Sequence, residues 1–402
     1  MLRCGLLGCD AAIATVAAAA VRRGDALVMG HEVGRAWGRQ PPIPRIESWE
    51  PLLDPQVADV VLVGSDDWSD RRAQAVRTLV QAGRPLVLSQ PLELSMLWAY
   101  ELDMIRRDTG AVLVPCLPDR LHPLVGRLRD AVEAAIAGVG DLGPIESIHC
   151  ERRLADRTKA AVLSAFCRDV DLVRAVVGDP ERLSTLAAAA DSAWPSLAIG
   201  LTSAMGIPTR WQVAPAGVPG LSIRLQSAAA EAVVVAPDDL DVPWTWNGVR
   251  SEPFDRGRAT LDALDLALGR GTSSRAVDAI PAAGWSDAAR AIELAETVPR
   301  SLARGRAIDL HREEYTDLGT FRGTMASLGC GLIMLALVVV IVATLAAGVA
   351  RELGWNAVSG IADAWPAIVL VVLGLFLALQ VIPLLIRGRD DPPPPQDQAR
   401  KT

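Results

Sequence analysis

Short apolar runs alternate with amphipathic helical stretches throughout residues 1–120, and this alternation restricts the fold more than any other feature. The apolar runs begin at positions 2, 26, 58, 84 and 111 and read LRCGLLG, ALVMGHEV, ADVVLVGS, RPLVLS and AVLVPC. Segments with helical spacing fill the gaps between them. Consecutive parallel strands need crossover connections, which helices supply with a right-handed sense. We therefore expect a doubly wound α/β sheet over residues 1–120.

The pattern changes in residues 121–315. Several strand-like segments rich in Val, Leu, Ile and Trp lie between Leu183 and Trp246, and helical patterns return at 259–268 and 286–303. Such a mixture predicts a second α/β domain, with a largely antiparallel sheet that helices cover on one face.

Two long runs near the C-terminus contain no charged residue, 323–350 and 364–386. Each exceeds the roughly 20 apolar residues that cross a hydrocarbon core, so we expect two transmembrane helices that form a hairpin in the membrane. Arginine and lysine flank the pair on its outer sides, whereas the connecting linker holds only Arg351. The positive-inside bias then places both termini in the cytoplasm and the linker outside. The Pro-rich tail 387–402 is expected to be disordered.

Charge and cysteine spacing exclude two classes of function. The chain has 40 Lys plus Arg against 47 Asp plus Glu, a net charge of -7, and no dense basic run. Nucleic acid would be repelled rather than bound. The six cysteines and four histidines are scattered without the spacing of a metal site, so no metal is expected.

Seven segments in order resemble the Gfo/Idh/MocA family of NAD(P)-dependent sugar and inositol oxidoreductases. They are GLLGCDAAIATVAAAA, ADVVLVGSDD, LVQAGRPLVLSQPLEL, RLHPLVGRLRDAV, GDLGPIESI, RDVDLVRAVVGDP and RAIELAETVPRSLARGRAIDL, which together extend over about residues 1–310. The resemblance implies a Rossmann-like first domain that binds NAD and a second domain that carries the substrate site. In that family the open face of the second sheet commonly forms a dimer interface. A homo-oligomer is therefore expected, with Trp194, Trp211, Trp244 and Trp246 either on that face or in the core.

The cofactor turn departs from the family pattern G-x-G-x-x-G/A. Here the sequence from Gly8 reads GCDAAI, so Cys9 precedes Asp10 at the second glycine position. We expect the Asp10 carboxylate to cap the following helix and to occupy the N–H groups that a phosphate would use. Glu32 stands where the family has an acid on the ribose, and is interpreted either in that role or as an exposed acid. The resemblance thus implies a weakened NAD site at Gly8, Cys9, Asp10, Glu32 and Ser65.

The family's catalytic positions have also changed. The lysine of its E-K-P motif aligns with Gln90, and its Asp and His on a helix align with Ser164 and Arg168. Neither glutamine nor arginine exchanges a proton near neutral pH. Lys159 is the one lysine of the first 310 residues, and is either a relocated catalytic group or a solvated side chain.

Two functions remain after these comparisons. The first is a membrane-tethered NAD-dependent sugar or polyol dehydrogenase that uses other catalytic groups. The second, which we favour, is a catalytically degenerate relative that keeps the fold as a binding or scaffolding module for a small molecule not identified by the sequence.

Overall fold

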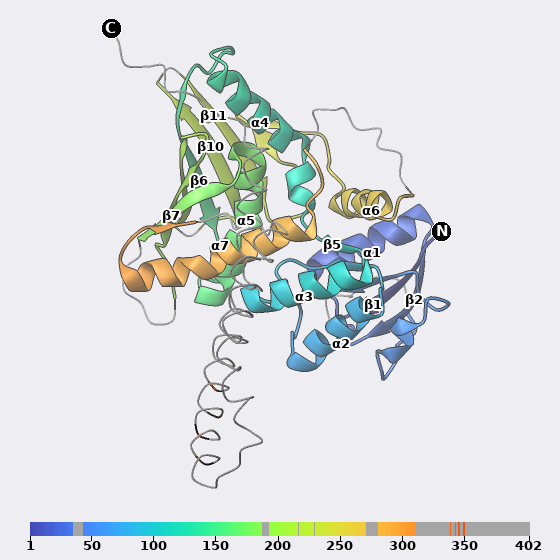
Figure 1. The fold of residues 1–402 in the computed structure, drawn as a ribbon. Helices are drawn as coiled ribbons and strands as arrows, with labels where there is room; N and C mark the ends of the chain where they lie inside the picture. The colour runs from blue at the N-terminus through green and yellow to red at the C-terminus, as the bar shows by residue number, and fades with distance from the viewer. Residues whose placement is uncertain are drawn as a thin grey trace, which may run out of the picture. The chain divides into compact units, whose positions relative to one another are not determined.

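The computed structural model describes residues 1–34, 43–186, 193–215, 217–228, 230–270 and 280–310, with four single positions beyond them. A five-stranded sheet in the order β2-β1-β3-β4-β5 comes first (Figure 1). Its strands are β1 (Arg3–Leu7), β2 (Ala26–His31), β3 (Val60–Val63), β4 (Leu86–Leu88) and β5 (Leu113–Pro115). All four pairings are parallel, which confirms the predicted doubly wound sheet.

Alternation along each strand divides the first core into two layers. Leu7, Val61 and Val63 pack with helices α2 (Asp70–Gln81) and α3 (Met96–Thr109) on one face. Leu6 and Leu62 point to the other face and pack with α1 (Ala11–Arg23). Both faces of the sheet are therefore buried, as the continuous apolar runs indicate.

The second sheet has nine strands in the order β13-β12-β11-β10-β6-β9-β8-β7-β14. In chain order these are β6 (Ile145–Arg153), β7 (Pro180–Leu186), β8 (Ala198–Ser203), β9 (Pro208–Val213), β10 (Gly220–Ser227), β11 (Glu231–Pro237), β12 (Thr245–Trp246), β13 (Val249–Arg250) and β14 (Ile308–Asp309). Only β6 and β9 pair in parallel. The prediction of a largely antiparallel sheet is confirmed.

One face of this sheet is covered by α4 (Pro123–Ile136), α5 (Lys159–Val177) and α7 (Trp285–Arg304). Trp211 and Trp244 are fully buried, and Trp194 nearly so. Trp246 is partly buried beneath the guanidinium of Arg127, 4.1 Å from its ring centroid. Of the two interpretations of these tryptophans, core packing is therefore correct for the first three.

The helix α6 (Arg256–Ala267) falls in the predicted second domain but packs against α1 of the first sheet (Figure 1). A Cβ on Gly257 would lie 2.5 Å from the carbonyl oxygen of Thr15, so only glycine permits this close approach. An ion pair of 2.7 Å joins Arg22 to Asp255 across the same contact. The chain therefore returns to the first sheet before it ends.

Residues 1–311 form one compact unit and residues 312–402 a second. The predicted spans 323–350 and 364–386 and the tail 387–402 lie outside the described residues, apart from positions 338, 342, 345 and 349, which are helical. Within the described ranges no helix has both the length and the hydropathy needed to cross a membrane.

Candidate functional site

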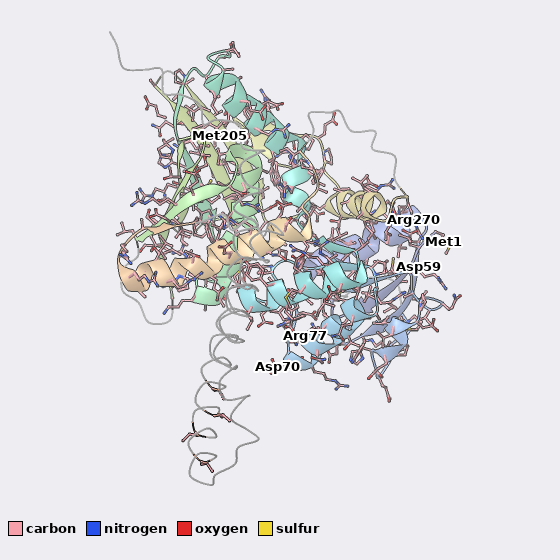
Figure 2. The ribbon with its side chains drawn as sticks, viewed as in Figure 1. Met1, Asp59, Asp70, Arg77, Met205 and Arg270 are labelled. Atoms are coloured by element: carbon pink, nitrogen blue, oxygen red, sulfur yellow. The ribbon has the colours of Figure 1, made fainter. Side chains whose placement is uncertain are left out.

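A cavity of about 430 Å³ lies at the carboxyl ends of the first sheet. Ser65, Ser89 and Cys116 follow the strands β3, β4 and β5 and line one side, together with the first turns of α1. Residues of α5, β10 and β11 line the opposite side. Met1 and Asp59, labelled in Figure 2, precede β1 and β3. They therefore mark the amino ends of the strands, opposite to the ends at which the cavity lies. The cavity has the position expected of a ligand site in an open α/β sheet.

The Asp10 carboxylate occupies the donors at the start of α1. Its Oδ1 accepts the backbone N–H of Ile13 at 2.9 Å, which makes Asp10 the helix N-cap and confirms that prediction. Its Oδ2 accepts both the backbone N–H and the hydroxyl of Ser65 at 2.7 Å. The Ser89 hydroxyl provides a further hydrogen bond. One backbone donor of the first turn of α1 and the backbone donor of Ser65 are therefore bound by a side chain, at the place where dinucleotide-binding folds hold a diphosphate.

A second carboxylate lies beside the first. Asp66 accepts the backbone N–H of Cys9 at 2.6 Å. Behind this turn the buried guanidinium of Arg72 contacts Asp66 and donates to the carbonyl oxygen of Gly64 at 3.1 Å. A Cβ on Gly8, whose φ is +71°, would lie 2.4 Å from that guanidinium. The Arg72 side chain thus fills the space next to Gly8, and no side chain larger than hydrogen fits at that position unless Arg72 moves.

The charge state of the turn follows from its surroundings. Burial alone would raise the pKa of Asp10, but hydrogen bonds from Ser89, Ile13 and Ser65 together hold that pKa below its ordinary value. Burial raises the pKa of the Cys9 thiol to about 12. At neutral pH the turn therefore presents an ionised Asp10 carboxylate to the cavity, and the buried Cys9 thiol beside it is neutral.

Glu32 follows β2 in the left-handed region, with φ at 51°. Its carboxylate is 2.9 Å from the guanidinium of Arg72 and 3.6 Å from the imidazole of His31. The sequence left a ribose ligand or an exposed acid as alternatives. The side chain is exposed, as the second alternative expected, and it also forms a salt bridge to Arg72. Nothing in the helical pattern distinguishes Arg72 from a surface arginine, so the sequence did not predict this pair.

The three family catalytic positions do not come together as a set. Gln90 is buried and lines the cavity, and its amide nitrogen is 3.3 Å from the carbonyl oxygen of Ala288. Arg168 lines the cavity and is exposed. Ser164 is half-buried and is not among the cavity-lining residues. Neither is Lys159, whose ammonium is 5.6 Å from the ring centroid of Trp194. The structure thus gives no support to a relocated catalytic lysine.

Two buried arginine–aspartate groups form the wall that α5 contributes. Asp169 accepts from the Arg152 side chain and from the indole N–H of Trp211, both at 2.8 Å. Asp171 lies 3.0 Å from Arg120, and burial raises the pKa of Asp171 to about 6 despite that guanidinium. Neither pair was predicted, because the partners are distant in sequence and meet only when β6, α5 and the segment after β5 fold together.

His122 has a structural role beside the cavity. Its Nδ1 accepts the backbone N–H of Leu124 at 3.1 Å and caps α4, and its ring stacks on Trp244 at 4.1 Å. Burial lowers the pKa of His122 to about 4. The ring is therefore neutral at physiological pH. Among the described residues no group of three or more His, Cys, Asp and Glu is placed to hold a metal ion.

The sequence matches no protein-family model, and no curated protein is similar enough to match it. Solved structures do match. A putative NADPH-dependent oxidoreductase from Desulfitobacterium hafniense has a TM-score of 0.60 at 12% identity, over 77% of this chain and 97% of that chain. The WlbA dehydrogenase of Bordetella pertussis in complex with NADH and UDP-GlcNAcA has a TM-score of 0.59 at 17% identity, over 78% of this chain and 99% of that chain. A putative myo-inositol dehydrogenase from Sinorhizobium meliloti has a TM-score of 0.58 at 16% identity, over 77% of this chain and 100% of that chain.

These neighbours show that the two-sheet unit has the fold of Gfo/Idh/MocA-type dehydrogenases. Identities of 12 to 17% carry the fold and leave the chemistry to the site itself. At the turn, the carboxylates of Asp10 and Asp66 hold the backbone N–H groups of Ile13, Ser65 and Cys9, an arrangement that suits a dinucleotide diphosphate poorly.

Proposed function

We propose that residues 1–310 form a binding module that keeps the dehydrogenase fold without its hydride-transfer chemistry. The observation that carries this proposal is the turn at Asp10, where the carboxylates of Asp10 and Asp66 accept three backbone N–H groups. Like charges a few ångströms apart repel by roughly 3 to 4 kcal/mol at an effective dielectric near 20. That repulsion corresponds to several-hundred-fold weaker binding, before the lost hydrogen bonds are considered.

The catalytic positions support the same proposal. Oxidation of a carbinol needs a group that accepts its proton, with a pKa near the working pH. Gln90 has no such pKa, and the guanidinium of Arg168 stays protonated. His122, which lies beside the cavity, uses Nδ1 to cap a helix. No general base is therefore available from these positions.

We further propose that the C-terminal hairpin holds this module at the cytoplasmic face of a membrane. The two uncharged runs and the arginine distribution are the basis for this placement. The helical residues Val338, Val342, Leu345 and Val349 are spaced by four, three and four positions, and each is more than half exposed. An exposed apolar helix face of this kind suits lipid contact rather than water.

A homo-oligomer through the open face of the second sheet is part of the proposal. His149, Arg210 and Arg224 are neighbours in register across β9, β6 and β10, and lie on the face opposite the buried residues. This face is polar, so its partner would supply ion pairs and hydrogen bonds rather than tryptophan packing.

Three experiments test the proposal. Full-length protein purified in mild detergent is denatured, and the released small molecules are identified by mass spectrometry; we expect no nicotinamide dinucleotide. The same protein should oxidise no sugar or polyol of a substrate panel with NAD or NADP. For topology, a cysteine introduced as Ser359→Cys should react with an impermeant maleimide in intact cells, whereas Thr402→Cys should react only after lysis.

The second candidate function is an active NAD-dependent dehydrogenase. The observation that favours it is the similarity to dehydrogenases solved with NADH. Dinucleotide recovered from the purified protein, together with turnover, would establish it in place of the binding module.

A further inference from the structure

The cavity contains one cation that no acid neutralises. Four arginines line it, and three of them form ion pairs: Arg120 with Asp171, Arg152 with Asp169 and Asp238, and Arg256 with Asp119. The fourth, Arg168, has no hydrogen-bond partner and no carboxylate within 4.0 Å among the residues that the structure describes. Arg168 is exposed and lines the cavity, so its guanidinium donors are available for a ligand.

The opposite wall has the reverse polarity. Asp10 carries a negative charge, and the hydroxyls of Ser65 and Ser89 donate their protons to it. Both serines line the cavity, and their hydroxyl oxygens keep lone pairs that can accept hydrogen bonds from a ligand. An anionic group is repelled from this wall, whereas neutral hydroxyl groups are accepted by it.

The volume of the cavity, and the side chain of Gln90 between its two walls, limit the size and polarity of the ligand. A volume of about 430 Å³ is near the lower end of small-molecule pockets, which extend from about 300 to about 1,000 Å³. Gln90 lines the space between the walls and reaches α5, where its amide nitrogen is 3.9 Å from the sulfur of Cys167, the neighbour of Arg168. The cavity suits a compact ligand with one anionic end and several hydroxyls.

We infer that this cavity binds a small polyhydroxylated monocarboxylate of the sugar-acid class. Its carboxylate lies on the Arg168 guanidinium, in the two-donor geometry that this pair prefers, and its hydroxyls lie against Ser65, Ser89 and Gln90. The inference rests on the proposed function. The sugar acid would occupy the space in which a dehydrogenase binds nicotinamide and substrate, so it requires that no dinucleotide is bound there. Arg168 is then the residue that selects an acid over the corresponding neutral polyol.

Isothermal titration of the full-length protein in detergent tests this assignment with a matched pair of probes, D-gluconate and D-sorbitol. The two differ only in the carboxylate that replaces one terminal alcohol. We expect D-gluconate to bind at least tenfold more tightly than D-sorbitol. The Arg168→Gln variant should weaken D-gluconate binding about 30-fold and leave D-sorbitol unchanged, as expected for loss of a charge-assisted hydrogen-bonded pair.

Two controls keep the result interpretable. Arg71→Gln removes an exposed arginine at the start of α2 that does not line the cavity, and should leave D-gluconate binding unaltered. Arg168→Lys keeps the charge but loses the planar fork, so its affinity should fall between those of wild type and Arg168→Gln. Equal melting temperatures of the variants show that they are folded.

The outcomes separate the inference from the proposed function. Absence of D-gluconate binding, equal affinity for D-sorbitol, or an unaffected Arg168→Gln variant overturns the sugar-acid assignment and leaves the binding-module proposal intact. Tight NADH binding with turnover of a sugar overturns the proposed function itself, whatever D-gluconate does.

Discussion

Replacement of Asp10 by alanine tests whether this carboxylate, and not a ligand, satisfies the donors at the start of α1. The change removes the helix N-cap, which is typically worth about 1 kcal/mol. It also removes the two hydrogen bonds from Ser65, each worth about 1 kcal/mol in a half-buried site. The free energy of unfolding of the 1–311 unit should therefore fall by about 3 kcal/mol. Asp10→Asn keeps a capping oxygen but loses the charge, and should cost only about 1 kcal/mol.

Thermal and denaturant unfolding of the full-length protein, followed by circular dichroism, provides the measurement. The pKa of Asp10 lies below its ordinary value, so its stabilising contribution is complete above about pH 4 and is lost as the pH falls through the folded-state pKa. The difference between wild type and Asp10→Ala should accordingly shrink at acid pH. A loss below about 0.5 kcal/mol at pH 7, or a loss that does not depend on pH, would refute the assigned role of this carboxylate.

Three further changes have expected outcomes. Since burial lowers the pKa of His122 to about 4, below the unfolded value of about 6.5, the contribution of His122 to stability should decline by about 2 kcal/mol between pH 6.5 and 4. His122→Asn keeps a capping oxygen, and should remove this part of the pH dependence of the free energy of unfolding. The same pH dependence in the variant and the wild type would contradict a buried, neutral His122. Arg152→Met should destabilise by about 3 to 5 kcal/mol because it strands the Asp169 carboxylate, and Arg152→Met with Asp169→Leu should recover part of that loss; a double variant as unstable as the single one would argue against it. Restoring the family groups with Gln90→Lys, Ser164→Asp and Arg168→His should yield no dehydrogenase activity in an NADH absorbance assay, because Ser164 does not line the cavity and Asp10 remains; measurable turnover would show an intact cofactor site.

The sheet architecture was predictable from the sequence because burial on both faces produces continuous apolar runs. The segments at β1, β3, β4 and β5 are all of this kind, and each was located to within a few residues. The capping role of Asp10 was predictable as well, since it depends only on a residue type at a helix start. The return of α6 to α1 was not, because a helical pattern does not specify which sheet it covers.

The chemistry of the cavity wall depends on contacts between residues far apart in the chain. Arg72 and Glu32 are 40 positions apart. Arg152 of β6 meets Asp169 of α5 and Asp238, which follows β11. Helical or strand periodicity makes such an arginine look like any polar surface residue. The sequence showed only that Arg168 replaces the histidine of the family pattern. It did not show that Arg168 is the one arginine of the described cavity lining without an ion-pair partner.

Equilibrium titration of NADH onto the full-length protein measures the central claim most directly. Wild type should show no saturable binding up to about 1 mM, since two carboxylates hold the amide donors of the turn. The Asp10→Gly and Asp66→Ala double variant should bind detectably more tightly than wild type, because it returns those donors and removes both charges. Wild-type binding in the micromolar range, unchanged in the double variant, would contradict this account.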